Sequence, residues 1–148
     1  MKIINLNKKA KYDYFLLDTF EAGIVLTGTE IKSIRKNGVN LKDSYIRIAS
    51  DLQAYLINLH ISHYEFGNRF NHDETRERKL LLNKREIKKL YQESKEKSLT
   101  IVPTKIYYER GMVKLEIALA QGKKNYDKRE VEKKRDAQRE IQKHLKNY

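Results

Sequence analysis

Apolar and polar residues alternate along most of the first 120 positions, which is typical of strands with one buried face. The alternation is clearest in four runs: 44–49, 53–61, 99–109 and 112–120. Short polar segments at 50–51 and 110–111 separate the members of each pair, so the pattern predicts two β-hairpins.

The alternation also predicts which side chains share a face. Ile46 and Ile48 fall on one face of their strand, and the alternate positions from Tyr55 to Ile61 fall on one face of the next. In the last strand the alternate positions from Val113 to Leu119 point to one side. Pro103 cannot donate to a ladder, which predicts an edge or a bulge in its strand.

A third hairpin is predicted near the N-terminus, from aromatic and β-branched residues at 12–18 and 22–27 with a turn near Glu21 and Gly23. Residues 64–75 have no periodicity and include Gly, Asn and His. They predict a loop longer than most connections in compact domains, and such loops are often functional.

Two capping-box spacings predict short helices. The first spans Thr27 to Glu30, is followed by apolar residues at helical spacing, and ends near Asn37. The second spans Asn83 to Glu86 and predicts a helix that runs to about residue 97.

Six or so short strands with local connections predict a mainly β fold, namely a small antiparallel oligonucleotide-binding-type barrel. Two or three short helices flank it. We assign this domain to residues 1–121, and we assign a basic C-terminal tail to residues 122–148.

The tail differs from the barrel in composition. Residues 121–148 contain ten basic and five acidic side chains, and apolar residues are sparse. Because so thin an apolar stripe cannot offset the entropy of ordering, the tail is expected to be disordered when free and helical when bound.

Charge points to a polyanion as the partner. The chain has 32 Lys and Arg against 20 Asp and Glu, a net charge of +12, which favours nucleic acid over a membrane. Zero cysteines exclude disulfides and Cys-based zinc sites, and no apolar run is long enough to span a bilayer. We expect a cytoplasmic, monomeric protein without a cofactor.

Catalytic signals are weak. His60, His63 and His72 could be assembled into a metal or acid–base site, so the alternative function is a metal-dependent ribonuclease. A His-x-x-His pair on one strand faces opposite sides, however, and no nucleophile elbow or phosphate-binding glycine loop is present. An ordinary ribosomal protein is a second alternative.

Cations with aromatic neighbours suit phosphates and unpaired bases. Phe66, Phe70 and His72 are interleaved with such cations in and after the loop. The predicted phosphate contacts there are Arg69, Arg76, Arg78 and Lys79. Lys32 and Arg35 give the first helix a basic face, although an exposed basic face is ordinary.

Four separated motifs, in the same order, resemble the SmpB family of bacterial SsrA-binding proteins. The motifs are 27–35 (TGTEIKSIR), 67–72 (GNRFNH), 75–83 (TRERKLLLN) and 122–129 (GKKNYDKR). The resemblance runs from about residue 7 to the C-terminus. It implies a non-enzymatic, barrel-shaped partner of transfer-messenger RNA (tmRNA) in trans-translation, the rescue of stalled ribosomes.

The resemblance also assigns residues. In the family the barrel holds the tRNA-like domain, and the tail enters the decoding region of small-subunit RNA and the empty mRNA channel. The positions that match RNA-binding ones are Glu30, Arg35, Leu81 and Asn83. Those that match the tail motif are Gly122, Lys123, Lys124, Tyr126, Asp127, Lys128 and Arg129. From the pattern alone, Glu30 and Asn83 could equally be helix caps, and Leu81 is more typical of a core.

Overall fold

The computed structural model describes residues 1–67, 70–124, 128–129, 132–133, 135–136 and 139. Its main sheet has seven antiparallel strands. Their spatial order is β1 (Lys2–Leu6), β8 (Thr100–Glu109), β9 (Met112–Gly122), β2 (Tyr14–Ile24), β7 (Arg78–Leu81), β5 (Ala54–Ile57) and β4 (Tyr45–Ile48). A small second sheet pairs β3 (Val39–Asn40) with β6 (His60–Ile61).

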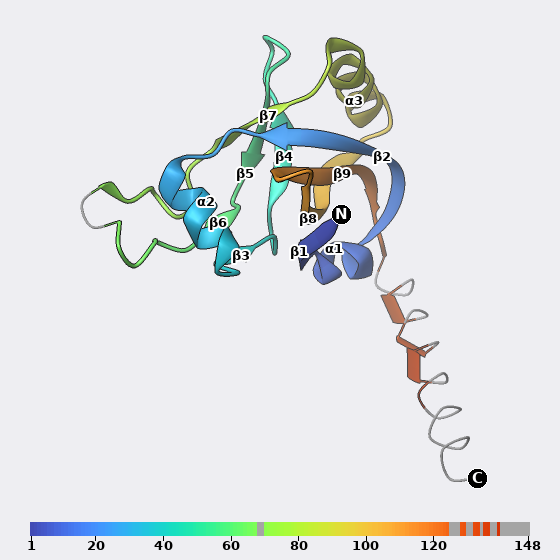
Figure 1. Cartoon of the computed structure of the whole chain (residues 1–148). Helices are drawn as coiled ribbons and strands as arrows, with labels where there is room; N and C mark the ends of the chain where they lie inside the picture. Colours follow the sequence, from blue (N-terminus) through green and yellow to red (C-terminus); the bar gives the residue numbers. More distant parts are fainter. Residues whose placement is uncertain (68–69, 125–127, 130–131, 134, 137–138, 140–148) are drawn as a thin grey trace.

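The main sheet curls on itself, so that β4 lies against β8 (Figure 1). The two end strands, β1 and β4, are not paired with each other in the described part of the chain. The result is an open barrel with short helices at its margins. The predicted mainly β, oligonucleotide-binding-type architecture is therefore confirmed, with the barrel left unclosed.

Among the described residues, three helices flank the sheet, namely α1 (Lys8–Asp13), α2 (Gly28–Arg35) and α3 (Lys84–Glu96). Both predicted capping boxes are present: Thr27 and Glu30 cap α2 reciprocally, and Asn83 and Glu86 cap α3. The chain leaves α2 through Asn37, which adopts a left-handed φ of 61°. The two capping-box spacings therefore predicted both helix starts correctly.

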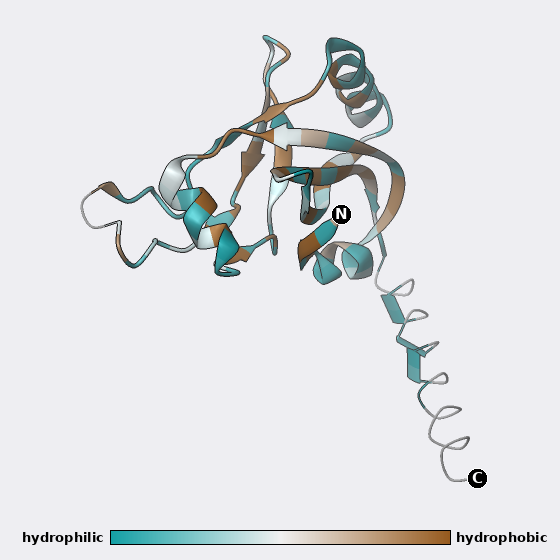
Figure 2. Cartoon of the chain, viewed as in Figure 1, coloured by the Kyte–Doolittle hydropathy of each residue, from teal (hydrophilic) through white to brown (hydrophobic). Residues whose placement is uncertain are grey.

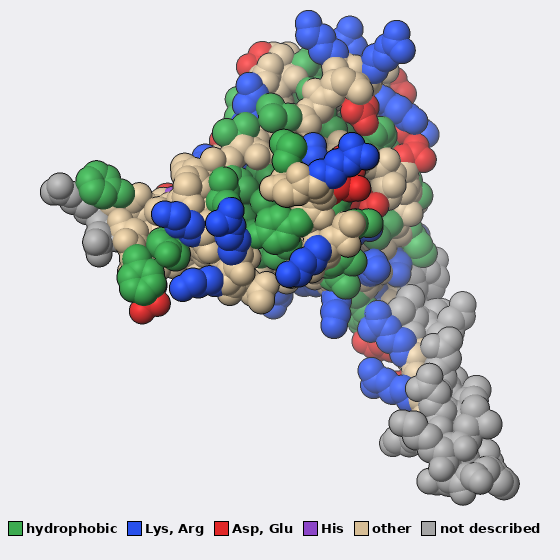
Figure 3. All heavy atoms as spheres, viewed as in Figure 1, with side chains coloured by type: hydrophobic (Ala, Val, Ile, Leu, Met, Phe, Trp, Pro, Cys, Tyr) green, Lys and Arg blue, Asp and Glu red, His purple; other side chains and the backbone are tan. Residues whose placement is uncertain are grey.

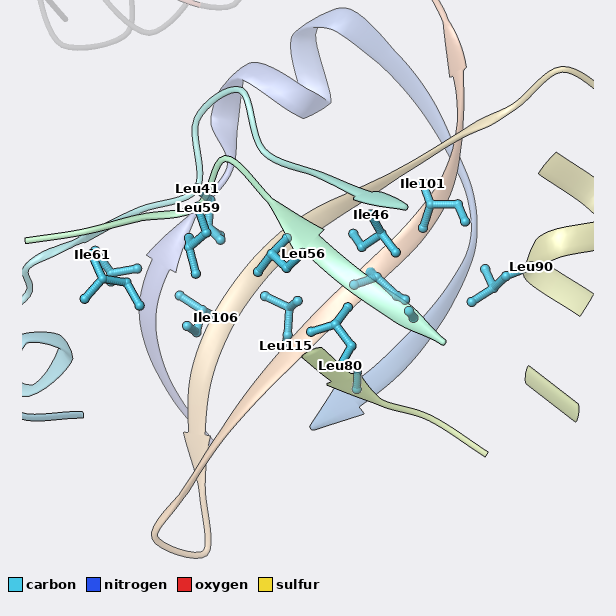
Figure 4. Close-up of a cluster of buried hydrophobic side chains, with 14 of the residues drawn as sticks. Leu41, Ile46, Leu56, Leu59, Ile61, Leu80, Leu90, Ile101, Ile106 and Leu115 are labelled. Atoms are coloured by element: carbon cyan, nitrogen blue, oxygen red, sulfur yellow. The ribbon is translucent and has the colours of Figure 1, made fainter. Parts of the chain in front are cut away.

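The core fills the inside of the curled sheet, and Figure 4 shows its side chains converging from strands, loops and α3. Leu56, Ile106 and Leu115 are fully buried at its centre, and Leu90 anchors α3 to one end. Burying such side chains contributes roughly 1.5–3 kcal/mol each relative to leaving them exposed. Many of the hydrophobic positions lie on the strands, whereas most of α3 and the described tail residues are hydrophilic (Figure 2).

The predicted N-terminal hairpin is wrong. Residues 8–13 form α1, which Asn7 caps by accepting a hydrogen bond from the Ala10 N–H, and β2 then runs unbroken from Tyr14 to Ile24. Gly23 is not in a turn; the Leu81 Cβ lies 3.3 Å from where a Cβ on Gly23 would be. The glycine therefore permits close approach of β7, while β2 pairs with β9 on its other side.

The predicted face of β5 is also wrong. Ala54 and Leu56 are buried, while Tyr55 and Ile57 are partly exposed. Asn58 adopts a positive φ of 64° and ends the strand, so the alternation changes phase there. As a consequence Leu59 and Ile61, which were predicted on the same face as Tyr55, are the buried residues of the next segment.

The last hairpin matches the prediction. β8 and β9 pair along their full length, and the register shifts between Pro103 and Lys105, which is the predicted bulge. Leu115, Ile117 and Leu119 are buried as expected. Ala120 on the opposite face is buried as well, because α1 covers it through Ala10.

Candidate nucleic-acid interface

Arg78 is completely enclosed at the start of β7. All five of its side-chain N–H groups have an acceptor. The acceptors are the Glu30 carboxylate and the main-chain carbonyls of Leu59, Asp73, Glu74 and Arg76. No donor is left for a phosphate, so the predicted phosphate contact of Arg78 is wrong, and the side chain instead ties the loop to the sheet.

Glu30 is the partner that makes this burial possible. Its carboxylate lies 2.5 Å from both Arg76 Nη2 and Arg78 Nε, and it accepts the Thr27 N–H at 2.8 Å. The side chain is fully buried. Of the two roles left open by the sequence, the geometry gives Glu30 the structural one, as a helix cap and ion-pair centre.

Burial of the Glu30 carboxyl would raise its pKa, but hydrogen bonds from Arg76, the Thr27 N–H and Arg78 outweigh burial and lower the pKa. At pH values between the lowered pKa of Glu30 in the folded protein and its value of about 4.3 in the unfolded chain, the unfolded chain binds more protons than the folded protein. The free energy of unfolding should therefore fall as the pH drops below about 4.3.

Urea unfolding at a series of pH values checks this expectation. Glu30→Gln should lower stability at pH 7 and flatten the acid dependence, because the glutamine cannot take up the proton. Glu77→Gln is the matched control, since Glu77 pairs with Arg47 while remaining 54% exposed. An acid dependence in Glu30→Gln equal to that of the wild type would contradict the assignment.

The exposed face of α2 forms the first part of the candidate interface. The Lys32 and Lys36 ammonium groups lie 5.4 and 5.5 Å from the centre of the Tyr64 ring, and Lys36 is 5.3 Å from the Phe66 ring. Figure 3 shows Lys and Arg side chains gathered over α2 beside large hydrophobic side chains of the neighbouring loop. We call Lys32, Arg35, Lys36, Tyr64 and Phe66 the α2–loop surface.

The loop adds two further predicted residues. Phe70 is 76% exposed. Arg69 lies outside the described residues. An exposed aromatic ring in this loop suits stacking on an unpaired base.

The outer face of β7 forms the second part. Arg78 and Leu80 point inward, so Lys79 and Leu81 point outward, and Leu81 is 55% exposed. The view of Leu81 as a core residue is therefore wrong. Val25, whose N–H donates to the Lys79 carbonyl at 2.9 Å, extends this surface and is itself exposed.

Arg76 joins the two parts. Its Nη2 donates to the Val25 carbonyl at 3.3 Å as well as to Glu30, and its Nη1 donates to the Glu77 carbonyl at 3.2 Å. The side chain is 30% exposed, so its role is mainly to hold β2 and α2 together. Asn83 caps α3 from an exposed position, which is compatible with a further contact.

The three histidines lie near one another, since His60 and His63 share Glu74 and the His63 and His72 ring centres are 5.7 Å apart, but they do not form a set of metal ligands. His60 Nε2 lies 2.5 Å from the Glu74 carboxylate, and His63 Nδ1 lies 3.6 Å from it. His72 is buried; its Nδ1 is 2.9 Å from Thr29 Oγ1 and its Nε2 is 2.8 Å from the Ile61 carbonyl oxygen. Within the described residues no three His, Asp or Glu side chains are grouped as metal ligands.

The tail begins against α1. The Lys123 N–H donates to the Asp13 carbonyl at 2.8 Å, and Lys128 Nζ lies 3.0 Å from Asp13 Oδ1. Glu132 Oε1 accepts the Tyr12 hydroxyl at 2.5 Å. The described residues from Lys128 onward have helical backbone and extend away from the barrel (Figure 1). Tyr126 and Asp127 lie outside the described residues.

Comparison with known proteins shows to which family the chain belongs. The family model described as SmpB protein matches residues 4–147. The chain belongs to the SmpB family. This confirms the resemblance given by the four motifs.

Similar SmpB proteins match over nearly the full chain. An SsrA-binding protein of Desulfitobacterium hafniense is 55% identical over 147 residues, covering 99% of this chain and 94% of the relative. One of Thermoanaerobacter pseudethanolicus is 57% identical over 146 residues, covering 99% and 93%. A solved chain described as "tmRNA-SmpB: a journey to the center of the bacterial ribosome" is 47% identical, with a TM-score of 0.68 over 82% of this chain and 85% of that one.

Several residues that shape this SmpB family member were not predicted as site residues. Tyr12 and Asp13 receive the tail, and Tyr64 orders the lysines of α2. Tyr12 and Asp13 were assigned to a strand, so their spacing gave no signal. Tyr64 could have been found, because an aromatic residue at the start of a long basic loop fits the same pattern as Phe66 and Phe70.

None of the described helices is long and apolar enough to cross a membrane.

Proposed function

We propose that this protein binds the tRNA-like domain of tmRNA (SsrA) and delivers it to stalled ribosomes in trans-translation. The full-length SsrA-binding relatives and the 47% identical chain described with tmRNA and the ribosome support this function. The observation in this chain that carries it is the α2–loop surface, where exposed Lys32 and Lys36 lie over the partly buried Tyr64 ring and Lys36 also lies over the exposed Phe66 ring.

The surface suits a folded RNA in particular. Lys32, Arg35 and Lys36 provide charges for phosphates, and none of them forms a salt bridge with a described carboxylate. Exposed Phe66 and Phe70 offer faces on which unpaired bases can stack. Contacts to phosphates fix the position of the RNA on the protein, and contacts to unpaired bases add selectivity. Such a surface therefore recognises RNA mainly by its shape. This is a binding role without catalysis.

Salt dependence of binding tests the surface. Lys32→Gln with Lys36→Gln should weaken binding of tmRNA and lower the slope of log affinity against log salt by roughly one unit per lost contact. The control is Lys95→Gln with Lys97→Gln, which removes two charges at the far end of α3. An unchanged affinity and slope in the α2 variant would remove this surface from the account.

We infer a separate role for residues 122–148 as the part that contacts the ribosome, reaching the decoding region and the empty mRNA channel. The contacts of Asp13 with Lys123 and Lys128 support a defined start, since they attach the first turn of the tail to the barrel. The described tail residues are almost all charged and exposed, which suits contact with ribosomal RNA. The tail therefore starts from a fixed point beside α1 on the barrel.

A further inference from the structure

A groove of about 500 Å³ lies between the turn that joins β4 and β5, the outer part of β7 and the first turns of α3. Its walls include apolar side chains, among them Leu52, Leu81 and Ile87. Lys79, Lys84 and Lys88 also line it. A volume in this range is sufficient for a small planar group, and an apolar wall with a few charges is typical of a ligand site.

The three lysines of the groove are exposed, and none forms an ion pair with a described carboxylate. The acidic residue that lines the groove, Asp51, uses Oδ1 to accept the Gln53 N–H at 3.1 Å. Lys89, on another side of the same helix, does have a carboxylate, since it lies 3.5 Å from Asp18. Positive charge therefore predominates at the groove, where three lysines face one carboxylate.

Helix stability does not explain this arrangement. Lys84 is the first residue of α3 and Lys88 follows one turn later. Positive charges near a helix N-terminus oppose the helix dipole, which favours acidic residues there. Lys84 thus opposes the helix dipole, and Lys84 and Lys88 repel each other one turn apart; both costs are offset when an anion binds between the two lysines.

The occupant must combine a flat apolar part with more than one negative charge. A paired base does not fit this description, because its faces are stacked inside the duplex, whereas an unpaired base exposes a face and carries phosphates on both sides. Lys79 and Leu81 belong both to the groove and to the outer face of β7, which Arg76 connects to α2. An RNA held on the α2–loop surface can continue along β7 into the groove.

We propose that the groove binds one unpaired nucleotide of the same RNA that the α2–loop surface holds. The base packs against Leu81 and Ile87, and the flanking phosphates lie on Lys79, Lys84 and Lys88. This inference rests on the proposed tmRNA binding and adds a second contact point, which makes recognition depend on the spacing between a folded region and an unpaired base.

The test uses the full-length protein and tmRNA. Lys84→Gln with Lys88→Gln should weaken tmRNA binding about tenfold and lower the salt slope by about 1.4, the value for two contacts to a single strand. Lys95→Gln with Lys97→Gln, in the last turn and at the C-cap of the same helix and outside the groove, should stay within about twofold of the wild type. Circular dichroism establishes that α3 is intact in both.

Crosslinking locates the base. With tmRNA that contains 4-thiouridine, irradiation should join an unpaired nucleotide to the segment 79–88, and the crosslink should be lost in the Lys84→Gln, Lys88→Gln protein. If both double variants bind tmRNA as tightly as the wild type, the groove does not bind this RNA. If the groove variant loses affinity only for ribosomes, the groove binds ribosomal RNA, and the proposal is overturned as well. Absence of tmRNA binding by all three proteins would instead reject the proposed function.

Discussion

Replacing Arg78 by alanine is expected to destabilise the fold by about 3–5 kcal/mol, the typical cost of removing one member of a buried ion pair. Glu30 would remain fully buried and would keep Arg76 as its other ion-pair partner. The carbonyls of Leu59 and Asp73 would lose a donor as well. Since small domains are stable by about 5–15 kcal/mol, much of the protein would unfold on warming.

Urea unfolding at pH 7 measures this effect, and the next residue supplies the control. Lys79→Ala removes the same charge from an exposed position on the same strand, so its stability should stay within about 0.5 kcal/mol of the wild type. The effect on RNA binding should differ from the effect on stability, since Lys79→Ala should fold normally but bind tmRNA more weakly than the wild type. Equal unfolding midpoints for the two variants would contradict the buried role of Arg78.

Truncation after Gly122 should abolish peptide tagging on stalled ribosomes while leaving affinity for isolated tmRNA within about tenfold. The cut follows the last residue of β9, so the pairing of Gly122 with Tyr14 is kept and the sheet is complete. The truncated protein loses the contacts of Tyr12 and Asp13 with the tail, which lie on the surface of the barrel. Only the ribosomal contact should therefore be removed.

Tagging in cells that lack their own SsrA-binding protein measures this second effect, with the full-length chain as reference. The thermal unfolding midpoint of residues 1–122 serves as the folding control. Normal tagging by the truncated protein would refute the division of labour between barrel and tail. A loss of tmRNA affinity by more than a hundredfold would refute it from the other side.

Elements fixed by neighbouring residues could be predicted from the sequence. The capping boxes at Thr27 and Asn83 act within one turn of helix, and both helices begin where expected. The β8–β9 hairpin is equally local, because Arg110 and Gly111 both adopt the positive φ of its turn.

Elements fixed by distant partners could not be predicted. Glu21 and Gly23 suggested a turn, but pairing with β9 on one side and β7 on the other keeps β2 continuous through these residues. The phase of β5 depends on the single left-handed residue Asn58, which alternation alone does not show. These are tertiary effects that override a local pattern.

The candidate site divides in the same way. Charge and the family motifs indicated the basic segment around β7, yet Arg78 and Lys79 are indistinguishable by charge. A one-residue change of phase in β7 exchanges the inward and outward side chains, so only the paired sheet shows that Arg78 binds Glu30 while Lys79 faces solvent. The sequence around Glu30 was likewise compatible with a helix cap and with an RNA contact, and only the structure shows that Arg76 and Arg78 are its partners.

The most direct test of the account is to crosslink this protein to RNA in living cells and sequence what it holds. The account predicts that tmRNA dominates the recovered RNA, with crosslinks in its tRNA-like domain mapping to the barrel. Small-subunit RNA of the decoding region should be joined to residues after 122. Uniform recovery of ribosomal RNA without enrichment of tmRNA, as expected for an ordinary ribosomal protein, would contradict it.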